Sequence, residues 1–125
     1  TQEAKKELVA ICDFPDSSSV FITPKPTRLI RRIIQIATDK DSIILDSFAG
    51  SGTTGQAVLT ANAEDGGSRR CVLVELDPGI ASNISRQRLE RMHRRKREQH
   101  RGAWLRLSLL PTRSRAAGRT REHQR

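Results

Sequence analysis

Residues 43–55 read IILDSFAGSGTTG, which is a short apolar run, an acid, and a turn with three glycines. Glycine adopts backbone angles that other residues avoid, so a glycine-rich turn after a strand lets the main chain approach a ligand closely. A helix that begins after such a turn offers unpaired N–H groups and the positive end of its dipole. This stretch therefore predicts a strand, a ligand-binding turn and a helix, in that order.

The sequence on both sides of this stretch alternates between helical and strand patterns. Residues 23–27, TPKPT, are predicted to be extended, because proline fixes φ and disfavours helix at the residue before it. The first strand, over 42–46, is expected to be buried, and after the turn we expect helix over 56–61, a loop over 62–70 and a second apolar strand over 71–75. Behind the prolines we expect an amphipathic helix whose apolar face is formed by Leu29, Ile30, Ile33, Ile34 and Ala37.

Asp77 and Pro78 suit the start of a further helix, predicted to run through Arg94, because Asp caps helix N-termini and Pro favours their first turn. The order strand, helix, strand, helix is typical of a βαβα unit with parallel strands, so the predicted fold class is α/β. We divide the chain into a loop-rich lead-in over 1–20, a βαβα region over 21–97 and a basic, disordered tail over 98–125.

Charge is distributed unevenly along the 125 residues. Residues 1–85 hold 9 Lys or Arg and 11 Asp or Glu, whereas residues 86–125 hold 14 and 3, so the C-terminal part supplies the net charge of +9. Such a tail could bind nucleic acid without sequence preference, and that binding would weaken with added salt. Composition alone favours the simpler interpretation, a solvated tail without order.

Cysteine content and hydropathy exclude several classes of protein. Cys12 and Cys71 are too few and too far apart to suggest a disulfide framework or a zinc site, and Cys71 is expected to be a buried small hydrophobe. No apolar stretch approaches the ~20 residues that span a bilayer, and no signal-peptide pattern is present. We expect a cytoplasmic protein with no membrane partner and no metal, and the start at Thr1 suggests a fragment.

The glycine-rich turn differs from two well-known nucleotide-binding motifs. A P-loop would need Gly-Lys-Ser or Gly-Lys-Thr at the end of its glycine-rich loop, and here Thr53 follows Gly52 with no lysine. Gly50, Gly52 and Gly55 have the spacing of a dinucleotide-binding motif, but the preceding Asp-Ser-Phe does not fit it. Spacing alone favours a nucleotide-type ligand and leaves a purely structural turn as the alternative.

Glu75 supports a ligand that contains a ribose. It ends the strand expected to lie beside the first, where an acid can accept hydrogen bonds from both ribose hydroxyls of an adenosine. A carboxylate at a strand end can also be simply solvated. For Asp77 we prefer a capping role, whereas the sequence shows no local role for Glu75.

Three motifs in this order resemble a known family. Residues 23–30 (TPKPTRLI), 44–54 (ILDSFAGSGTT) and 72–77 (VLVELD) resemble the cofactor half of the permuted amino-methyltransferases of DNA, most of all the modification subunits of type III restriction systems. The resemblance covers about residues 21–92. It implies a partial Rossmann-like fold, S-adenosylmethionine as cofactor, and DNA as partner, with a restriction subunit or a second methyltransferase subunit as further partners.

The resemblance also implies roles for individual residues. Glu75 matches the ribose-binding acid of the family. Thr23, Lys25 and Pro26 match the segment that closes over the cofactor. The residues that match the first motif, on the methionine side of the cofactor, are Asp46, Phe48, Gly50, Gly52 and Thr53.

The chain departs from the family in what it lacks. Members need an Asp-Pro-Pro-Tyr-like motif to hold the flipped-out base, and this chain has neither adjacent prolines nor any tyrosine, so we assign no catalytic residue. The predicted function is the cofactor-binding part of a DNA methyltransferase, with adenine N6 favoured over cytosine N4. The alternatives are a non-catalytic basic nucleic-acid-binding protein on a degenerate methyltransferase core, or a truncated inactive product.

Overall fold

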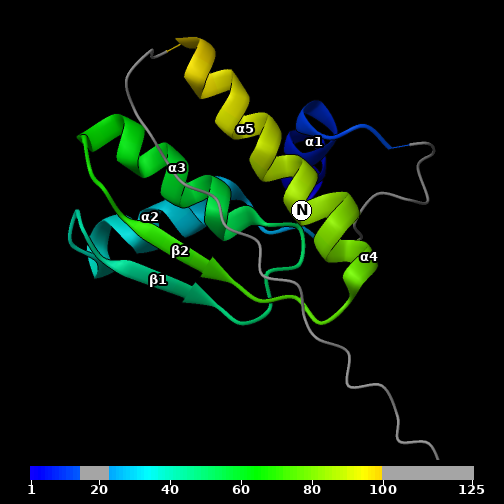
Figure 1. Cartoon of the computed structure of the whole chain (residues 1–125), viewed down its shortest axis with the longest axis horizontal. Helices are drawn as coiled ribbons and strands as arrows, with labels where there is room; N and C mark the ends of the chain where they lie inside the picture. The colour runs from blue at the N-terminus through cyan, green and yellow to red at the C-terminus, as the bar shows by residue number, and fades with distance from the viewer. Residues whose placement is uncertain (15–22, 100–125) are drawn as a thin grey trace, which may run out of the picture.

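The computed structural model describes residues 1–14 and 23–99 (Figure 1). None of the helices in these two ranges is long and apolar enough to cross a membrane. The elements in chain order are α1 (Gln2–Ile11), α2 (Thr27–Ala37), β1 (Ile43–Asp46), α3 (Thr53–Asp65), β2 (Arg70–Leu73), α4 (Pro78–Ile80), the π-helical segment η1 (Ala81–Ser85) and α5 (Arg86–Gln99).

The two strands pair in parallel, with Ile43 opposite Arg70 and Asp46 opposite Leu73. Helix α3 connects them, and α2 and α3 pack together against one face of the sheet. The core between these layers is built from Ile34, Ala57, Val58 and Ala61, with Ile30, Ile44 and Cys71 packed against it. The predicted α/β class with parallel strands is therefore confirmed.

The opposite face of the sheet is uncovered by the described helices. Ile43 and Leu45 of β1 are 60% and 67% exposed, and Val72 of β2 is also exposed. The prediction of a buried first strand was therefore wrong for this face, because side chains alternate between the faces of a strand and, among the described residues, only one face carries helices. Continuous apolar strands of this kind usually belong to parallel sheets covered on both sides.

Helix α2 likewise buries less than its sequence pattern predicts. Ile34 is buried and Ile30 half-buried against α3, but Leu29, Ile33 and Ala37 are exposed. The predicted apolar face is thus correct in its helical spacing and wrong in its extent. The described elements packed against α2 cover only the part of its apolar face that contains Ile30 and Ile34.

The lead-in over 1–20 is not mainly loop, because residues 2–11 form α1. The hydroxyl of Thr1 accepts a hydrogen bond from the main-chain N–H of Ala4 at 3.4 Å and so caps the helix. Leu8 and Ile11, one turn apart on one face, are buried with Cys12. They pack against Ile84 and Met92 of the last helix, so tertiary contacts stabilise a helix that its polar sequence did not predict.

The last three helical elements form one continuous helix from Pro78 to Gln99, extending past the predicted end at Arg94. Asp77 caps it as predicted, with its Oδ1 accepting hydrogen bonds from the N–H groups of Gly79 and Ile80 at 2.7 and 3.2 Å. Residues 98 and 99 of the predicted tail belong to α5. The predictions for the rest of the tail lie outside the described residues.

Both cysteines are free, and burial raises the pKa of each thiol. Cys71 was expected to be buried and is half-buried, because the described part of the chain forms a sheet of two strands with helices on one side. Its contact with the core between α2, α3 and the sheet agrees with the role of a small hydrophobe.

A buried arginine closes the turn between α3 and β2 and supports a prediction about pH. The Arg69 guanidinium donates to Oδ2 of Asp65 at 2.8 Å, and this hydrogen bond lowers the pKa of Asp65. A carboxyl with a lowered folded pKa contributes stability above its unfolded pKa and loses it as the pH falls through the folded value. We expect an NMR titration to place the Asp65 pKa below 3.8, and Arg69→Gln to return it toward 3.8; an unshifted value in the unmodified chain would contradict this ion pair.

Candidate functional site

The glycine-rich turn after β1 adopts backbone angles that require glycine at two positions. Gly50 and Gly52 have φ of +53° and +73°, in the left-handed region that residues with a Cβ rarely adopt. The N–H of Gly52 donates to the carbonyl of Ala49 at 2.8 Å, which closes the turn, and Gly52 is the residue before α3. The loop therefore leads directly into the N-terminus of a helix, as the sequence predicted. The predicted bounds of 56–61 were too short, because α3 has 13 residues and includes residues 62–65 of the predicted loop.

Close packing explains the third glycine of the motif. A Cβ built on Gly55 would lie 2.6 Å from Cδ2 of Leu89 and 3.0 Å from Cδ1 of Leu73. Gly55 thus allows α3 to contact α5 and the end of β2. A Cβ on Gly52 would lie 3.3 Å from the main chain of Ser85, so that glycine has a packing role as well.

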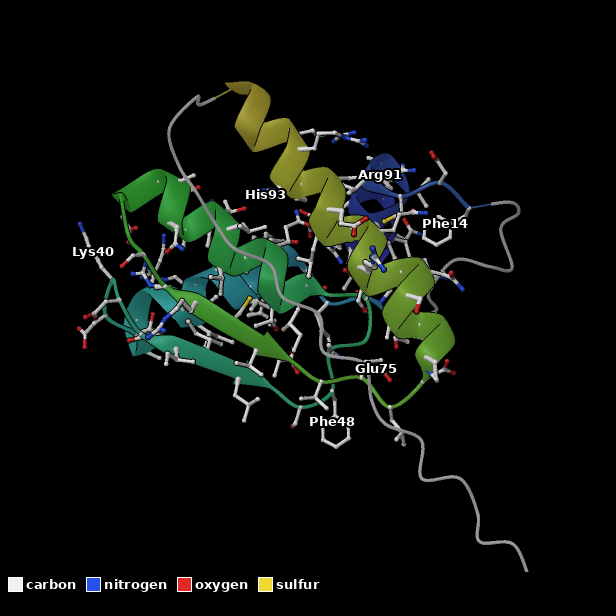
Figure 2. All side chains as sticks on the ribbon, in the orientation of Figure 1. Phe14, Lys40, Phe48, Glu75, Arg91 and His93 are labelled. Atoms are coloured by element: carbon white, nitrogen blue, oxygen red, sulfur yellow. The ribbon has the colours of Figure 1, made fainter. Side chains whose placement is uncertain are left out.

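Asp46 at the end of β1 determines the start of the loop. Its Oδ1 accepts a hydrogen bond from the N–H of Phe48 at 3.1 Å, and its Oδ2 accepts one from the hydroxyl of Thr54 at 2.6 Å. The carboxylate therefore ties the first residues of the turn to the first turn of α3. The Phe48 side chain is 88% exposed and projects away from the sheet at the same end as Glu75 (Figure 2).

Glu75 contacts the loop directly. Its Oε2 accepts a hydrogen bond from the N–H of Gly50 at 2.8 Å, and its Oε1 accepts one from the N–H of Asp77 at 3.0 Å. The view that Glu75 has no local role was therefore wrong. The local contact is the one to Asp77, two residues further on. The contact to Gly50 spans a separation of 25 positions that hid it in the sequence, and the parallel pairing of β1 with β2 creates it.

The extended segment before α2 reaches the same loop through its main chain. The carbonyl of Lys25 accepts a hydrogen bond from the hydroxyl of Thr53 at 3.3 Å, and Pro26 is the residue that precedes α2. The side chains of Thr23 and Lys25 are exposed. The structure thus brings Lys25, Pro26 and Thr53 together with Asp46, Gly50, Gly52 and Glu75, while Thr23 lies at the exposed start of the segment.

Arg88 of α5 is the main residue of this region that the sequence analysis missed. Its side chain is fully buried, although arginine is almost never fully buried unless paired. Desolvation lowers the pKa of Arg88, the Glu7 carboxylate acts in the opposite direction, and an arginine remains charged. It donates to the carbonyl of Ser51 (3.2 Å), the hydroxyls of Ser51 (3.1 Å), Thr53 (3.0 Å) and Thr27 (3.1 Å), and Oε1 of Gln56 (2.6 Å).

A signal for Arg88 was present in the sequence. Ile84 and Met92 lie four residues before and after it, and both pack in the apolar cluster under α1. A charged residue in the middle of an apolar helical stripe indicates either an error in the helix prediction or a buried polar contact. Ser85, whose hydroxyl donates to the carbonyl of Gly50, had no comparable signal.

The arrangement combines groups suited to a polar, ribose-containing ligand. The loop and the first turn of α3 present main-chain N–H donors and a positive dipole end. Asp46 and Glu75 stand at the carboxyl ends of adjacent parallel strands, where α/β sheets bind their ligands. Within residues 1–14 and 23–99, no group of three or more His, Cys, Asp or Glu side chains could hold a metal ion.

Comparison with known proteins assigns the family. The DNA methylase family N6_N4_Mtase matches residues 2–87, which include both strands, the glycine-rich loop and Glu75. This chain belongs to that family. The match extends over α1 as well, which the resemblance of residues 21–92 did not include.

Similar proteins come from restriction-modification systems. The Mod subunit of the type III enzyme StyLTI from Salmonella typhimurium is 43% identical over 104 residues, covering 73% of this chain and 15% of that subunit. The EcoPI Mod subunit of Escherichia phage P1 is 45% identical over 63 residues, covering 50% of this chain and 10% of the subunit. The type II methyltransferase M.KpnI of Klebsiella pneumoniae is 44% identical over 75 residues, covering 60% of this chain and 17% of that methyltransferase. The chain thus spans less than a fifth of each relative.

Proposed function

We propose that this chain is the S-adenosylmethionine-binding part of a DNA methyltransferase of a restriction-modification system. The observation that carries the proposal is the hydrogen bond between Glu75 and the N–H of Gly50, at 2.8 Å. It places an acid suited to ribose beside a glycine-rich loop suited to the methionine part of the same molecule. Membership in the DNA methylase family supports this ligand over other adenosine compounds.

The residues of the site fit the polar groups of this cofactor. A carboxylate has about four lone-pair positions, and Glu75 uses two of them for main-chain N–H groups, so two remain for ribose hydroxyls. The exposed Phe48 and the main chain of the loop at Gly50 and Gly52 would lie along the methionine part. The segment of Thr23, Lys25 and Pro26 would close over the cofactor from the side of α2.

The target and partners belong to the same proposal. We infer methylation of the exocyclic N6 of adenine in DNA, with cytosine N4 as the alternative that the family shares. A restriction subunit or a second methyltransferase subunit would be the protein partner. Support for these partners comes from relatives that are Mod subunits of type III restriction-modification enzymes.

The test measures how tightly S-adenosylmethionine and an analogue without ribose hydroxyls bind to the unmodified chain and to variants near the end of β2. The unmodified chain should bind S-adenosylmethionine more tightly than an analogue without ribose hydroxyls, by about 1.5–3 kcal/mol, because hydrogen bonds to a charged acceptor are lost. Glu75→Ala should bind both weakly and lose this discrimination. Isothermal titration calorimetry measures both affinities.

Asp77→Ala provides the matched control, because Asp77 lies two residues away and its carboxylate caps α4. This variant should discriminate between the two cofactors as the unmodified chain does. Full discrimination in Glu75→Ala would contradict the ribose assignment. Binding of neither cofactor by the unmodified chain would contradict the proposed function itself.

A further inference from the structure

The acceptors of Arg88 belong to the segments that form the proposed cofactor site. Ser51 and Thr53 lie in the glycine-rich loop and at the start of α3, and Thr27 begins α2 immediately after the prolines. No carboxylate among the described residues lies within ion-pair distance of Arg88. Its charge is thus directed at neutral oxygens of the loop and its neighbours.

We propose that Arg88 is a positioning residue that holds the glycine-rich loop in the conformation that receives the cofactor. The proposal rests on the S-adenosylmethionine-binding function proposed above and deepens it. Arg88 acts through the main chain of Ser51, from beneath the loop. Its own side chain is fully buried and does not need to touch the ligand.

Peptide geometry explains how a contact beneath the loop affects its other side. The described chain contains no cis peptide bond, and in a trans peptide the C=O and the next N–H point in opposite directions. The Ser51 carbonyl faces Arg88, so the N–H of Gly52 points the other way, where it bonds the carbonyl of Ala49. The Gly50 carbonyl accepts from Ser85, which directs the N–H of Ser51 away from η1. Two bonds from one helix therefore orient two consecutive peptides of the loop.

Stability alone does not account for an arginine at this position. Burying a charge has a large desolvation cost, and neutral acceptors repay less of it than a carboxylate does. An apolar residue would continue the helical stripe of Ile84 and Met92 without this desolvation cost. What an apolar residue cannot do is bind the Ser51 carbonyl and three side-chain groups of the site at once, since Arg offers five donors in a fixed fork.

The first measurement is amide hydrogen exchange of the full chain without cofactor. In Arg88→Met, the Gly52 amide should exchange at least about tenfold faster relative to the Arg70 amide, a tenfold change being about 1.4 kcal/mol. The Arg70 N–H donates a hydrogen bond to the carbonyl of Ser42 at the opposite end of the sheet. Its exchange rate therefore reports any loss of stability of the whole fold. A merely structural role for Arg88 would change both amides equally.

The second measurement is S-adenosylmethionine affinity by calorimetry. Arg88→Met should bind the cofactor at least about tenfold more weakly at a temperature where it is folded. Arg91→Met is the matched control, because Arg91 lies one turn further along α5 and donates to the carbonyl of Ile11 and to Asp13 instead of the loop (Figure 2). The control should keep the Gly52 exchange rate and the affinity of the unmodified chain.

If Arg88→Met does not fold, Arg88→Lys takes its place. Lysine keeps the charge and most of the stem but has three donors on one atom, so the same changes in smaller amount are expected. The inference would be overturned if a folded Arg88 variant kept both the Gly52 amide exchange rate and the S-adenosylmethionine affinity of the unmodified chain. Faster Gly52 exchange in Arg88→Met, in a chain whose unmodified form binds no cofactor, would support loop positioning and refute the proposed function instead.

Discussion

The purified 125-residue chain is expected to transfer no methyl groups to DNA, even with S-adenosylmethionine and DNA in excess. Transfer to an amino nitrogen requires the base to be extruded from the duplex, stacked and hydrogen-bonded so that the nitrogen faces the methyl group. Such positioning can account for roughly 7–11 kcal/mol of the barrier. The chain has no tyrosine and no adjacent prolines, so it lacks the motif that the family resemblance implies for this task.

A second polypeptide that contains this motif and a recognition domain is expected to restore activity. The uncovered face of the sheet, with Ile43, Leu45 and Val72, offers apolar surface for such a polypeptide, and so do Leu29 and Ile33 of α2. Co-expression followed by transfer of labelled methyl groups to plasmid DNA is the assay. The same experiment with Asp46→Ala in this chain is the control, and it should abolish the restored activity, because Asp46 orders the loop through Phe48 and Thr54.

Clear incorporation by the isolated chain would contradict this prediction. If that incorporation were lost in Asp46→Ala, the catalytic groups would lie within these 125 residues, outside any Pro-Pro motif. The candidate stacking residues would then be Phe14, Phe21, Phe48 and Trp104.

Gly55→Leu is expected to unfold the chain or to lower its unfolding free energy by at least about 1–3 kcal/mol, the usual cost of an overpacked core. The first added carbon already comes within 2.6 Å of Cδ2 of Leu89, whose side chain is buried and has little room to move. Leucine favours helix over glycine by somewhat less than about 1 kcal/mol, which offsets only part of this cost. Thermal and chemical denaturation followed by circular dichroism measure the change.

Ala63→Leu is the matched control on the same helix. Ala63 is exposed, so the added side chain meets solvent, and the two residues differ little in helix propensity. Its unfolding free energy should stay within about 0.5 kcal/mol of the unmodified value. If the unfolding free energy of Gly55→Leu equalled that of Ala63→Leu, then α3 and α5 would not pack as closely as they do in the structure.

The sequence by itself determined the class of fold, and it predicted most of the residues that the structure brings together at the candidate site. The run of residues 43–55 specifies strand, loop and helix through local rules: a short apolar run, glycines at positive φ, and a helix that begins directly after Gly52. Asp77 as a cap is equally local, because donors and acceptor lie within three residues. The order of three motifs indicated the family before any contact was known.

Only the tertiary structure decided the contacts between segments distant in the chain. Glu75 is hydrogen-bonded to Gly50, and Arg88 is hydrogen-bonded to Ser51, 37 positions away. The parallel strands and the last helix bring these groups to one end of the sheet. The tertiary structure also decided that α1 is a helix and that one sheet face is exposed. Burial and long-range hydrogen bonds depend on which surfaces meet, and a local pattern can state that a face is apolar but not what covers it.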